Sequence, residues 1–376
     1  MSDYGKTAAA YVPGSTRASA FSTGRLMLVE AENSGRVIFA KLHADSQREK
    51  HMAPLMKQAI LTGHGFEIRD LPKPSCDRTT VLVRTMAIGI CGGDVGIYKN
   101  TAGRGAKELA LGHEASGEVI DVGADVKSLR IGDLVTALGG KFAEYNTFDP
   151  ADLVRLPPAV NPLWALGEPV ACCVHAMSRS KIKAGDRVAI VGCGFMGLIC
   201  LQLARERNAQ EITAIDTVPT RLAMAKRLGA RQVQNANELS IDRLHAEGRD
   251  FSGEYDVVIE AAGNQAALDL CGYLVKQHGL INLVGHHFSN EGRRTVYMNQ
   301  WNVKAIDVVN GHVRRNDEKY AAMEQGVQLA AGGRLMIEPL VTCYPLSKIE
   351  EAVQQCLTGQ NNLIKAVITP GEQGGG

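Results

Sequence analysis

A glycine-rich turn between an apolar strand and a helix is the feature that most constrains how this chain can fold. Arg187–Val191 has the composition of a buried strand, and a helical pattern follows at Leu198–Arg207. Between them Gly192, Gly194 and Gly197 have the spacing G-x-G-x-x-G. The first glycine permits a tight turn, the second admits a pyrophosphate close to the backbone, and the third lets helix and strand pack closely. We therefore predict a dinucleotide-binding turn; the alternative is a glycine turn in an α/β domain that binds no nucleotide.

Strands alternate with helices through the following hundred residues. This alternation predicts an α/β fold with a doubly wound parallel sheet. After Asn310 the sequence predicts one more helix at Asp317–Ala331, and then shorter elements at Leu340–Thr342, Leu346–Leu357 and Ile364–Ile368. The elements predicted within the sheet are strands at Glu211–Asp216, Tyr255–Glu260, Gly279–Val284 and Val303–Val309, with a helix at Thr220–Leu228.

An acidic residue at the end of the second strand bears on the choice of dinucleotide. Asp216 lies 19 residues after Gly197, where a carboxylate can accept hydrogen bonds from a ribose hydroxyl. The same carboxylate would repel a 2′-phosphate, so we predict NAD rather than NADP. Arg221 is placed to pack on the adenine, and Phe195 and Met196 complete the turn. The alternative role for Asp216 is that of a helix cap.

The chain before residue 184 has a different texture. Short strand-like pieces such as Thr80–Arg84 alternate with turns from Met56 to the break at Leu156-Pro157-Pro158, which predicts a mostly β domain. A length of 376 residues also favours two domains over one. Residues 1–55 form an N-terminal extension, in which Arg25–Glu30 and Arg36–Ala40 could pair as a hairpin.

Three potential metal ligands precede the nucleotide-binding segment. Cys91 is followed 22 residues later by His113, in Gly-His-Glu, and then by Glu168, in Gly-Glu-Pro. Cysteine, histidine and glutamate are all zinc ligands, and three protein ligands with one open position suit a catalytic zinc. Each residue alone has an ordinary explanation, because an isolated cysteine is usually a small buried hydrophobe. Their order ahead of a dinucleotide fold favours a metal site.

With these motifs the sequence resembles the zinc-dependent medium-chain dehydrogenase/reductase family, in particular its alcohol, sorbitol and threonine dehydrogenase branches. The resemblance covers about residues 56–370 and implies that Cys91, His113 and Glu168 bind the catalytic zinc. Glutamate at the third position is similar to the polyol dehydrogenase branch. Glu114, beside the histidine, would support these ligands or serve as an alternate one.

The resemblance also implies a domain organisation and an assembly. A GroES-like catalytic domain would span residues 56–177 and be completed by 312–370, with a Rossmann domain at 178–311 inserted between them. Residues 371–376 end in three glycines and are predicted to be a disordered tail. The family implies a homodimer or homotetramer.

The sequence departs from the family in the number of zinc sites. Members with a second, structural zinc carry four closely spaced cysteines between the second and third ligands. This chain has no cysteine between Cys91 and Cys172, so we predict one catalytic zinc and no structural zinc.

A second departure affects proton transfer. Family members usually have a serine or threonine two residues after the cysteine ligand and often a histidine three residues further on; here these positions are Gly93 and Gly96. The proton of the alcohol therefore needs another exit. Candidates are Tyr98 on the same segment, and four residues that follow the last strands of the nucleotide-binding sheet: His286, His287, Asn310 and His312. Asn310 would also contact the nicotinamide. A solvated loop is the alternative for each histidine.

Composition excludes several other classes of function. A net charge of +1 gives no reason to expect nucleic acid or an anionic membrane as a partner. Nine cysteines, an odd number, argue against a secreted disulfide framework and favour a reducing cytoplasm. Cys172, Cys173 and His175 are best explained by packing.

We predict reversible oxidation of a small secondary alcohol, such as a polyol, sugar or cyclitol, with hydride transfer to NAD. One alternative is a reductase of an activated C=C or C=N bond, which needs no alkoxide proton relay. Another is a nucleotide-binding protein without catalysis, although such a protein has no need for Cys91 and Glu168 together.

Overall fold

The structure is a computed structural model, and it describes residues 27–29, 38–40, 54–102, 108–246, 248–359 and 363–371. It separates residues 1–53 from residues 54–376. In the first part β1 (Met27–Val29) pairs antiparallel with β2 (Ile38–Ala40), as predicted for the hairpin. Most of the predicted tail, residues 372–376, lies outside the described residues. No described helix is long and apolar enough to cross a membrane.

The second part contains a β-rich half built on a seven-stranded sheet in the order β16-β17-β5-β6-β7-β9, with β8 also paired to β5. A separate hairpin of β3 and β4 packs beside it. Two strands of this sheet, β16 and β17, come from the C-terminal end of the chain, so the β-rich half is completed by sequence that follows the nucleotide-binding half. Its elements are β3 (Leu55–Thr62), β4 (Gly65–Pro72), β5 (Val81–Gly89), α1 (Gly92–Thr101), β6 (Ala115–Val122), β7 (Leu134–Ala137), β8 (Tyr145–Phe148), β9 (Leu153–Arg155), α8 (Asn316–Ala331), β16 (Val341–Pro345), α9 (Ile349–Thr358) and β17 (Lys365–Thr369).

The nucleotide-binding half is a six-stranded parallel sheet in the order β12-β11-β10-β13-β14-β15. This order confirms the predicted doubly wound topology. Helix α2 (Gly167–Arg179) leads into it. Its elements are β10 (Arg187–Val191), α3 (Phe195–Glu206), β11 (Glu211–Asp216), α4 (Pro219–Arg227), β12 (Gln232–Asn235), α5 (Ile241–Ala246), β13 (Tyr255–Glu260), α6 (Gln265–Leu274), β14 (Val275–Leu283), α7 (Met298–Lys304) and β15 (Asp307–Asn310).

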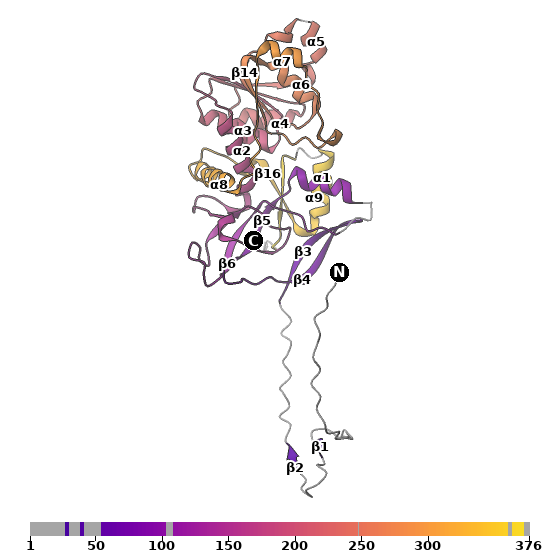
Figure 1. The fold of residues 1–376 in the computed structure, drawn as a ribbon, viewed down its shortest axis with the longest axis vertical. Coiled ribbons are helices and arrows are strands. Elements are labelled where there is room, and N and C mark those ends of the chain that lie inside the picture. Colours follow the sequence, from indigo (N-terminus) through magenta and orange to yellow (C-terminus); the bar gives the residue numbers. More distant parts are fainter. Residues whose placement is uncertain are drawn as a thin grey trace, which may run out of the picture. The chain divides into compact units, whose positions relative to one another are not determined.

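Alternating side chains place helices on both faces of this sheet. In β10, Val188 and Ile190 belong to the core that includes α2 and α3, whereas Ala189 and Val191 belong to the core that includes α6. Because the inner strands β10, β11 and β13 are covered on both faces, they are apolar along most of their length, which explains why the sequence identified them. In Figure 1, α1 and α9 lie side by side between the nucleotide-binding half, marked by α6 and β14, and the strands β3 and β4.

One predicted element is wrong in its first half. Val303 and Lys304 belong to the last turn of α7, and strand β15 begins only at Asp307. The helix ends at Ala305, which has a left-handed φ of 48°. Lys304, whose side chain is 1% exposed, donates hydrogen bonds to three carbonyls at the end of α6 and its following residue. This tertiary contact, which the apolar pattern does not encode, extends the helix.

Candidate active site

Cys91 lies at the start of α1, just after the end of β5 in the β-rich sheet. It is the N-cap residue of the helix, and its Sγ accepts a hydrogen bond from the Gly93 amide at 3.4 Å. The Asp94 carboxylate accepts from the Cys91 amide at 2.9 Å, which completes a capping box. The thiol is therefore held in one place by the local backbone.

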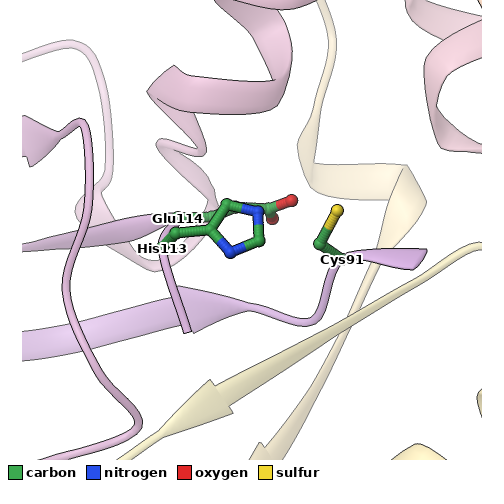
Figure 2. Close-up of side chains that lie close together, drawn as sticks. All are labelled: Cys91, His113 and Glu114. Atoms are coloured by element: carbon green, nitrogen blue, oxygen red, sulfur yellow. The ribbon is translucent and has the colours of Figure 1, made fainter. Parts of the chain in front are cut away.

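His113 and Glu114 lie immediately before β6, the strand paired with β5. Ligand atoms of Cys91, His113 and Glu114 lie within 4.8 Å of one another. Among the residues that the structure describes, these three side chains form the group that could hold a metal ion. Figure 2 shows the thiol, the imidazole and the carboxylate converging on one space. One soft sulfur, one imidazole and one carboxylate suit a zinc ion.

The His113 imidazole is oriented by a carboxylate behind it. Its Nδ1 lies 3.6 Å from Asp94 Oδ1, and Asp94 is buried. A carboxylate in this position is the usual partner of a metal-binding histidine. Without a metal, Asp94, and to a lesser extent Cys91, raise the pKa of His113 to about 11. A metal therefore has to displace a proton to bind here.

A buried lysine that the sequence analysis missed contacts Glu114. Lys365, in β17, places its Nζ 2.5 Å from Glu114 Oε2 and donates to the Ile90 carbonyl at 2.9 Å. Burial alone would lower the pKa of Lys365, but Glu114 outweighs it and the net pKa is raised. The signal available in the sequence was a single charge inside the apolar run Ile364–Ile368, because a buried charge requires a partner.

The predicted third ligand lies outside this cluster, so its role as a ligand stays a prediction. Glu168, on the first turn of α2, is absent from the cluster, where Glu114 takes its place. Glu168 Oε1 accepts hydrogen bonds from Lys319 Nζ at 3.0 Å and from Cys172 Sγ at 3.6 Å. Glu168 still lies near the cluster: burial raises the pKa of Glu114, Lys365 opposes the rise, and the Glu168 carboxylate adds to it.

Each glycine of the predicted dinucleotide turn has the role expected of it. Gly192 has a φ of +97°, which favours glycine. A Cβ on Gly194 would meet nothing within 4 Å, so this position is open to a pyrophosphate. A Cβ on Gly197 would lie 1.8 Å from the Gly192 carbonyl oxygen, because helix α3 packs directly on the turn. These residues fit a dinucleotide.

A cavity of about 550 Å³ opens beside this turn. Its wall includes Gly192, Gly194, Asp216 and Arg221, four of the predicted cofactor residues, together with Asn237, Ser240 and Asp242. The Asp216 carboxylate accepts hydrogen bonds from the Cys193 amide at 2.6 Å and the Val218 amide at 2.8 Å. It thus caps the turn and lines the cavity, so the two roles weighed for it are compatible.

Three other predicted cofactor residues lie outside the wall of this cavity. Phe195 is buried, and its ring centroid is 5.2 Å from Lys365 Nζ. Met196 contacts Cys173 Sγ through its sulfur at 3.5 Å. The side-chain oxygen of Asn310, at the end of β15, accepts from the His312 amide at 3.0 Å, and its carbonyl accepts from Arg179.

The histidines after β14 have different surroundings. Arg294 Nε donates to His287 Nδ1 at 2.8 Å, and His287 Nε2 lies 3.1 Å from the buried Glu260 carboxylate. Both ring nitrogens are thus engaged, and the predicted relay role of His287 is not supported. His286 and His312 instead face each other with ring centroids 5.5 Å apart.

The predicted role of Tyr98 is also not supported. Its hydroxyl donates to Glu350 and accepts from Gln354 Nε2 at 2.7 Å, both on α9. Its ring stacks on Phe66 at 5.8 Å between centroids and is buried. Tyr98 therefore links α1 to α9, and its hydroxyl is engaged by two side chains of α9.

The two unusual glycines of α1 have space around them. A Cβ on Gly93 would meet only Cys91 Sγ, at 3.7 Å, so packing does not require glycine there. A Cβ on Gly96 would lie 3.9 Å from the ring of Phe288. The Phe288 ring is in turn 3.8 Å from that of His286. The loop after β14 therefore reaches the helix that begins at Cys91.

Comparison with known proteins supports what the geometry indicates. Family models described as an alcohol dehydrogenase GroES-like domain and a zinc-binding dehydrogenase match residues 77–158 and 196–329. Sorbitol dehydrogenase of Gallus gallus is 30% identical, with 82% of this chain and 94% of the relative covered. The chain belongs to the zinc-dependent medium-chain dehydrogenase family.

Other relatives of the dehydrogenase agree with this assignment. Sorbitol dehydrogenase of Bacillus subtilis is 29% identical over 84% of this chain and 97% of the relative. The crystal structure of an Escherichia coli oxidoreductase of unknown specificity has a TM-score of 0.74 at 25% identity, covering 85% of this chain and all of the other. The predicted family, fold class and enzyme class are confirmed: the chain is an oxidoreductase of the zinc-dependent alcohol and polyol dehydrogenase type.

Proposed function

We propose that this dehydrogenase oxidises a secondary hydroxyl of a polyol or related sugar alcohol with NAD, at one zinc ion held by Cys91, His113 and Glu114. The observation that carries the proposal is the convergence of these three ligand types within 4.8 Å, in a chain whose glycine-rich turn also borders a cavity of about 550 Å³. The sorbitol dehydrogenases among its relatives support a polyol over a simple alcohol.

Each protein residue of such a site has a separate role. Cys91, His113 and Glu114 would hold the zinc, which acts as a Lewis acid and makes a hydroxyl more acidic. Asp94 keeps the imidazole oriented, and Lys365 balances the carboxylate charge. The chemistry that NAD would supply when bound is that of a hydride acceptor. Gly194 leaves room for its pyrophosphate, and the Asp216 carboxylate would disfavour the 2′-phosphate of NADP.

A single zinc site is part of the proposal. After β7 the chain runs through residues 138–144 directly into β8, so this stretch is short as well as free of cysteine. All nine cysteines of the chain are free thiols. Free thiols also suit the reducing cytoplasm that we propose as the compartment.

We assign the proton exit to His312 and its neighbour His286. Burial lowers the pKa of His312 from its ordinary value of 6.5, so its ring is neutral at pH 7 and able to accept a proton. His312 Nε2 lies 3.4 Å from the Gly285 carbonyl, which favours a proton on that nitrogen and leaves Nδ1 as the acceptor. His286 stands between His312 and Phe288, toward the solvent-exposed side.

Replacing His312 with glutamine is expected to lower kcat for alcohol oxidation about 10²-fold at pH 7, because general-base assistance is lost. Added imidazole should restore part of the rate. Wild-type oxidation should decline as the pH falls below 6.5, where His312 becomes protonated, and this acidic limb should disappear in the variant. His64→Gln, on an exposed turn, is the control. An unchanged kcat and pH profile in His312→Gln would remove the relay.

We also propose that two chains associate through the edge of the nucleotide-binding sheet. Strand β15 is the edge strand, and large apolar side chains are exposed on it and on the preceding α7 region: Tyr297 (45%), Met298 (54%), Val303 (50%) and Val308 (42%). An unpaired strand edge with such a patch favours pairing with another copy. Light scattering should give a dimer or tetramer for the wild type and a smaller species for Val308→Lys. A wild-type monomer would contradict this.

The proposed function is tested on protein purified without chelator. Metal content, NADH and NADPH binding, and activity on polyols, simple alcohols and conjugated carbonyls are measured on the same sample. One zinc per chain, tighter NADH than NADPH binding and polyol oxidation support the proposal. Two zincs per chain would contradict the single site, and reduction of conjugated carbonyls alone would replace the dehydrogenase reaction with C=C reduction.

A further inference from the structure

Glu114 and Glu168 are the two acidic side chains considered for the third ligand position, and each is paired with a different lysine. Glu114 is paired with Lys365 and belongs to the ligand cluster. Glu168 is paired with Lys319 and does not belong to the ligand cluster. The geometry points to a role for Lys319: we infer that it holds Glu168 away from the zinc, so that Glu114 is the third ligand and the fourth position stays open for substrate. This inference rests on the proposed zinc site.

The Glu168–Lys319 pair joins two helices and is largely shielded from water. Glu168 is on the first turn of α2, and Lys319 is on the first turn of α8, which packs along α2. The side chains are 13% and 19% exposed, so their attraction is screened less than that of a surface pair. Lys319 Nζ donates to Glu168 Oε1 at 3.0 Å.

The second oxygen of Glu168 is the one that could reach a metal. Oε1 accepts from both Lys319 and Cys172, whereas Oε2 makes no hydrogen bond to any described residue. The charge of this carboxylate is therefore compensated chiefly by Lys319. If that ammonium is removed, a zinc ion held by Cys91, His113 and Glu114 would be a source of positive charge for Glu168, whose carboxylate already acts electrostatically on Glu114, and Lys365 is already paired.

Removal of Lys319 is therefore expected to strengthen metal binding, whereas a substitution that only disrupted the site would weaken it. We expect Lys319→Met to bind divalent metal about 10-fold more tightly, the size of effect typical of residues that contact metal ligands. Glu168 then adds a ligand and fills the position that a catalytic zinc keeps open. Alcohol oxidation should fall even though the metal is held better.

Cobalt(II) in place of zinc reports the number of metal ligands directly, since its visible absorption weakens when the coordination number rises from four to five. Wild type, Lys319→Met, Lys319→Arg and the double variant Lys319→Met/Glu168→Gln are loaded with cobalt, and spectra and affinities are recorded. Lys319→Met should absorb more weakly and bind more tightly. Lys319→Arg keeps the charge and should resemble wild type, and the double variant should recover the wild-type spectrum because the added ligand is gone.

Two single substitutions test which glutamate is the third ligand even if Lys319→Met fails to fold. Glu114→Gln should change the cobalt spectrum, and Glu168→Gln should leave it unchanged. A wild-type spectrum and affinity in folded Lys319→Met would overturn the inference, as would a change in Glu168→Gln equal to that in Glu114→Gln. Wild-type protein that takes up no cobalt would refute the proposed zinc site itself, which separates the two failures.

Discussion

Replacing Cys91 with serine is expected to release the zinc and to lower kcat/KM by about 10³-fold or more. Loss of a Lewis acid removes several kcal/mol of transition-state stabilisation, and each 1.4 kcal/mol is a factor of about ten. Serine is itself a preferred N-cap residue, so the cap on the Gly93 amide is kept and α1 remains formed. The loss would therefore report the metal site and not the fold.

Metal content by elemental analysis, kcat/KM with a polyol, and the circular dichroism spectrum measure the three parts of this prediction. Cys343→Ser, an exposed thiol in β16, is the matched control and should retain zinc and activity. Retention of one zinc and near wild-type activity in Cys91→Ser would show that the ligand cluster does not bind the catalytic metal.

The second large effect is on stability. Lys304→Met is expected to lower the free energy of unfolding by about 3 kcal/mol, because buried carbonyls that lose their donor cost about 1–3 kcal/mol each. The ammonium donates to Gly272, Tyr273 and Val275 carbonyls at 2.8, 3.1 and 2.9 Å, and these are groups that the end of α6 leaves without helical partners. Burial lowers the pKa of Lys304 to about 8, so the charged donor still prevails at pH 7.

Urea unfolding of the metal-loaded protein, followed by tryptophan fluorescence, measures this change. Lys226→Met is the matched control, since Lys226 Nζ also donates to a backbone carbonyl, that of Arg231, but at an exposed site. Its effect should be under about 1 kcal/mol. Equal midpoints for the two variants would mean that the end of α6 does not depend on Lys304.

The nucleotide-binding half shows how far local pattern carries a prediction. Strands β10, β11 and β13 begin and end where the sequence predicts, because each is a short apolar run bounded by polar turns and covered on both faces. The exception is the segment around Val303, which is apolar enough for a strand but belongs to α7. Its helical state depends on Lys304 reaching the end of α6, a contact made across more than 25 residues.

The metal site shows what the local sequence pattern does not predict. Motif and spacing identified Cys91 and His113, since a thiol and an imidazole in these contexts have few other uses. They predicted Glu168, whereas Glu114 is the carboxylate that lies beside Cys91 and His113, and each of the two acids is paired with a lysine from a distant element. Lys365 and Lys319 come from β17 and α8, more than 140 residues from the acids they contact. The partners of His287 and Tyr98 were also not predicted: Arg294, Glu260 and Glu350 engage the polar atoms that a proton relay would use.

The sequence by itself determined the α/β fold and the glycine-rich turn after β10, and it singled out Cys91 and His113 as candidate metal ligands. These follow from backbone sterics, apolar periodicity and ligand chemistry, all of which act over a few residues. Only the tertiary structure decided which carboxylate lies beside Cys91 and His113, which partners the histidines after β14 have, and the state of residues 303–304. Those outcomes depend on the pairing of buried charges and donors, and a buried polar group takes the partner that the fold brings within about 3 Å of it.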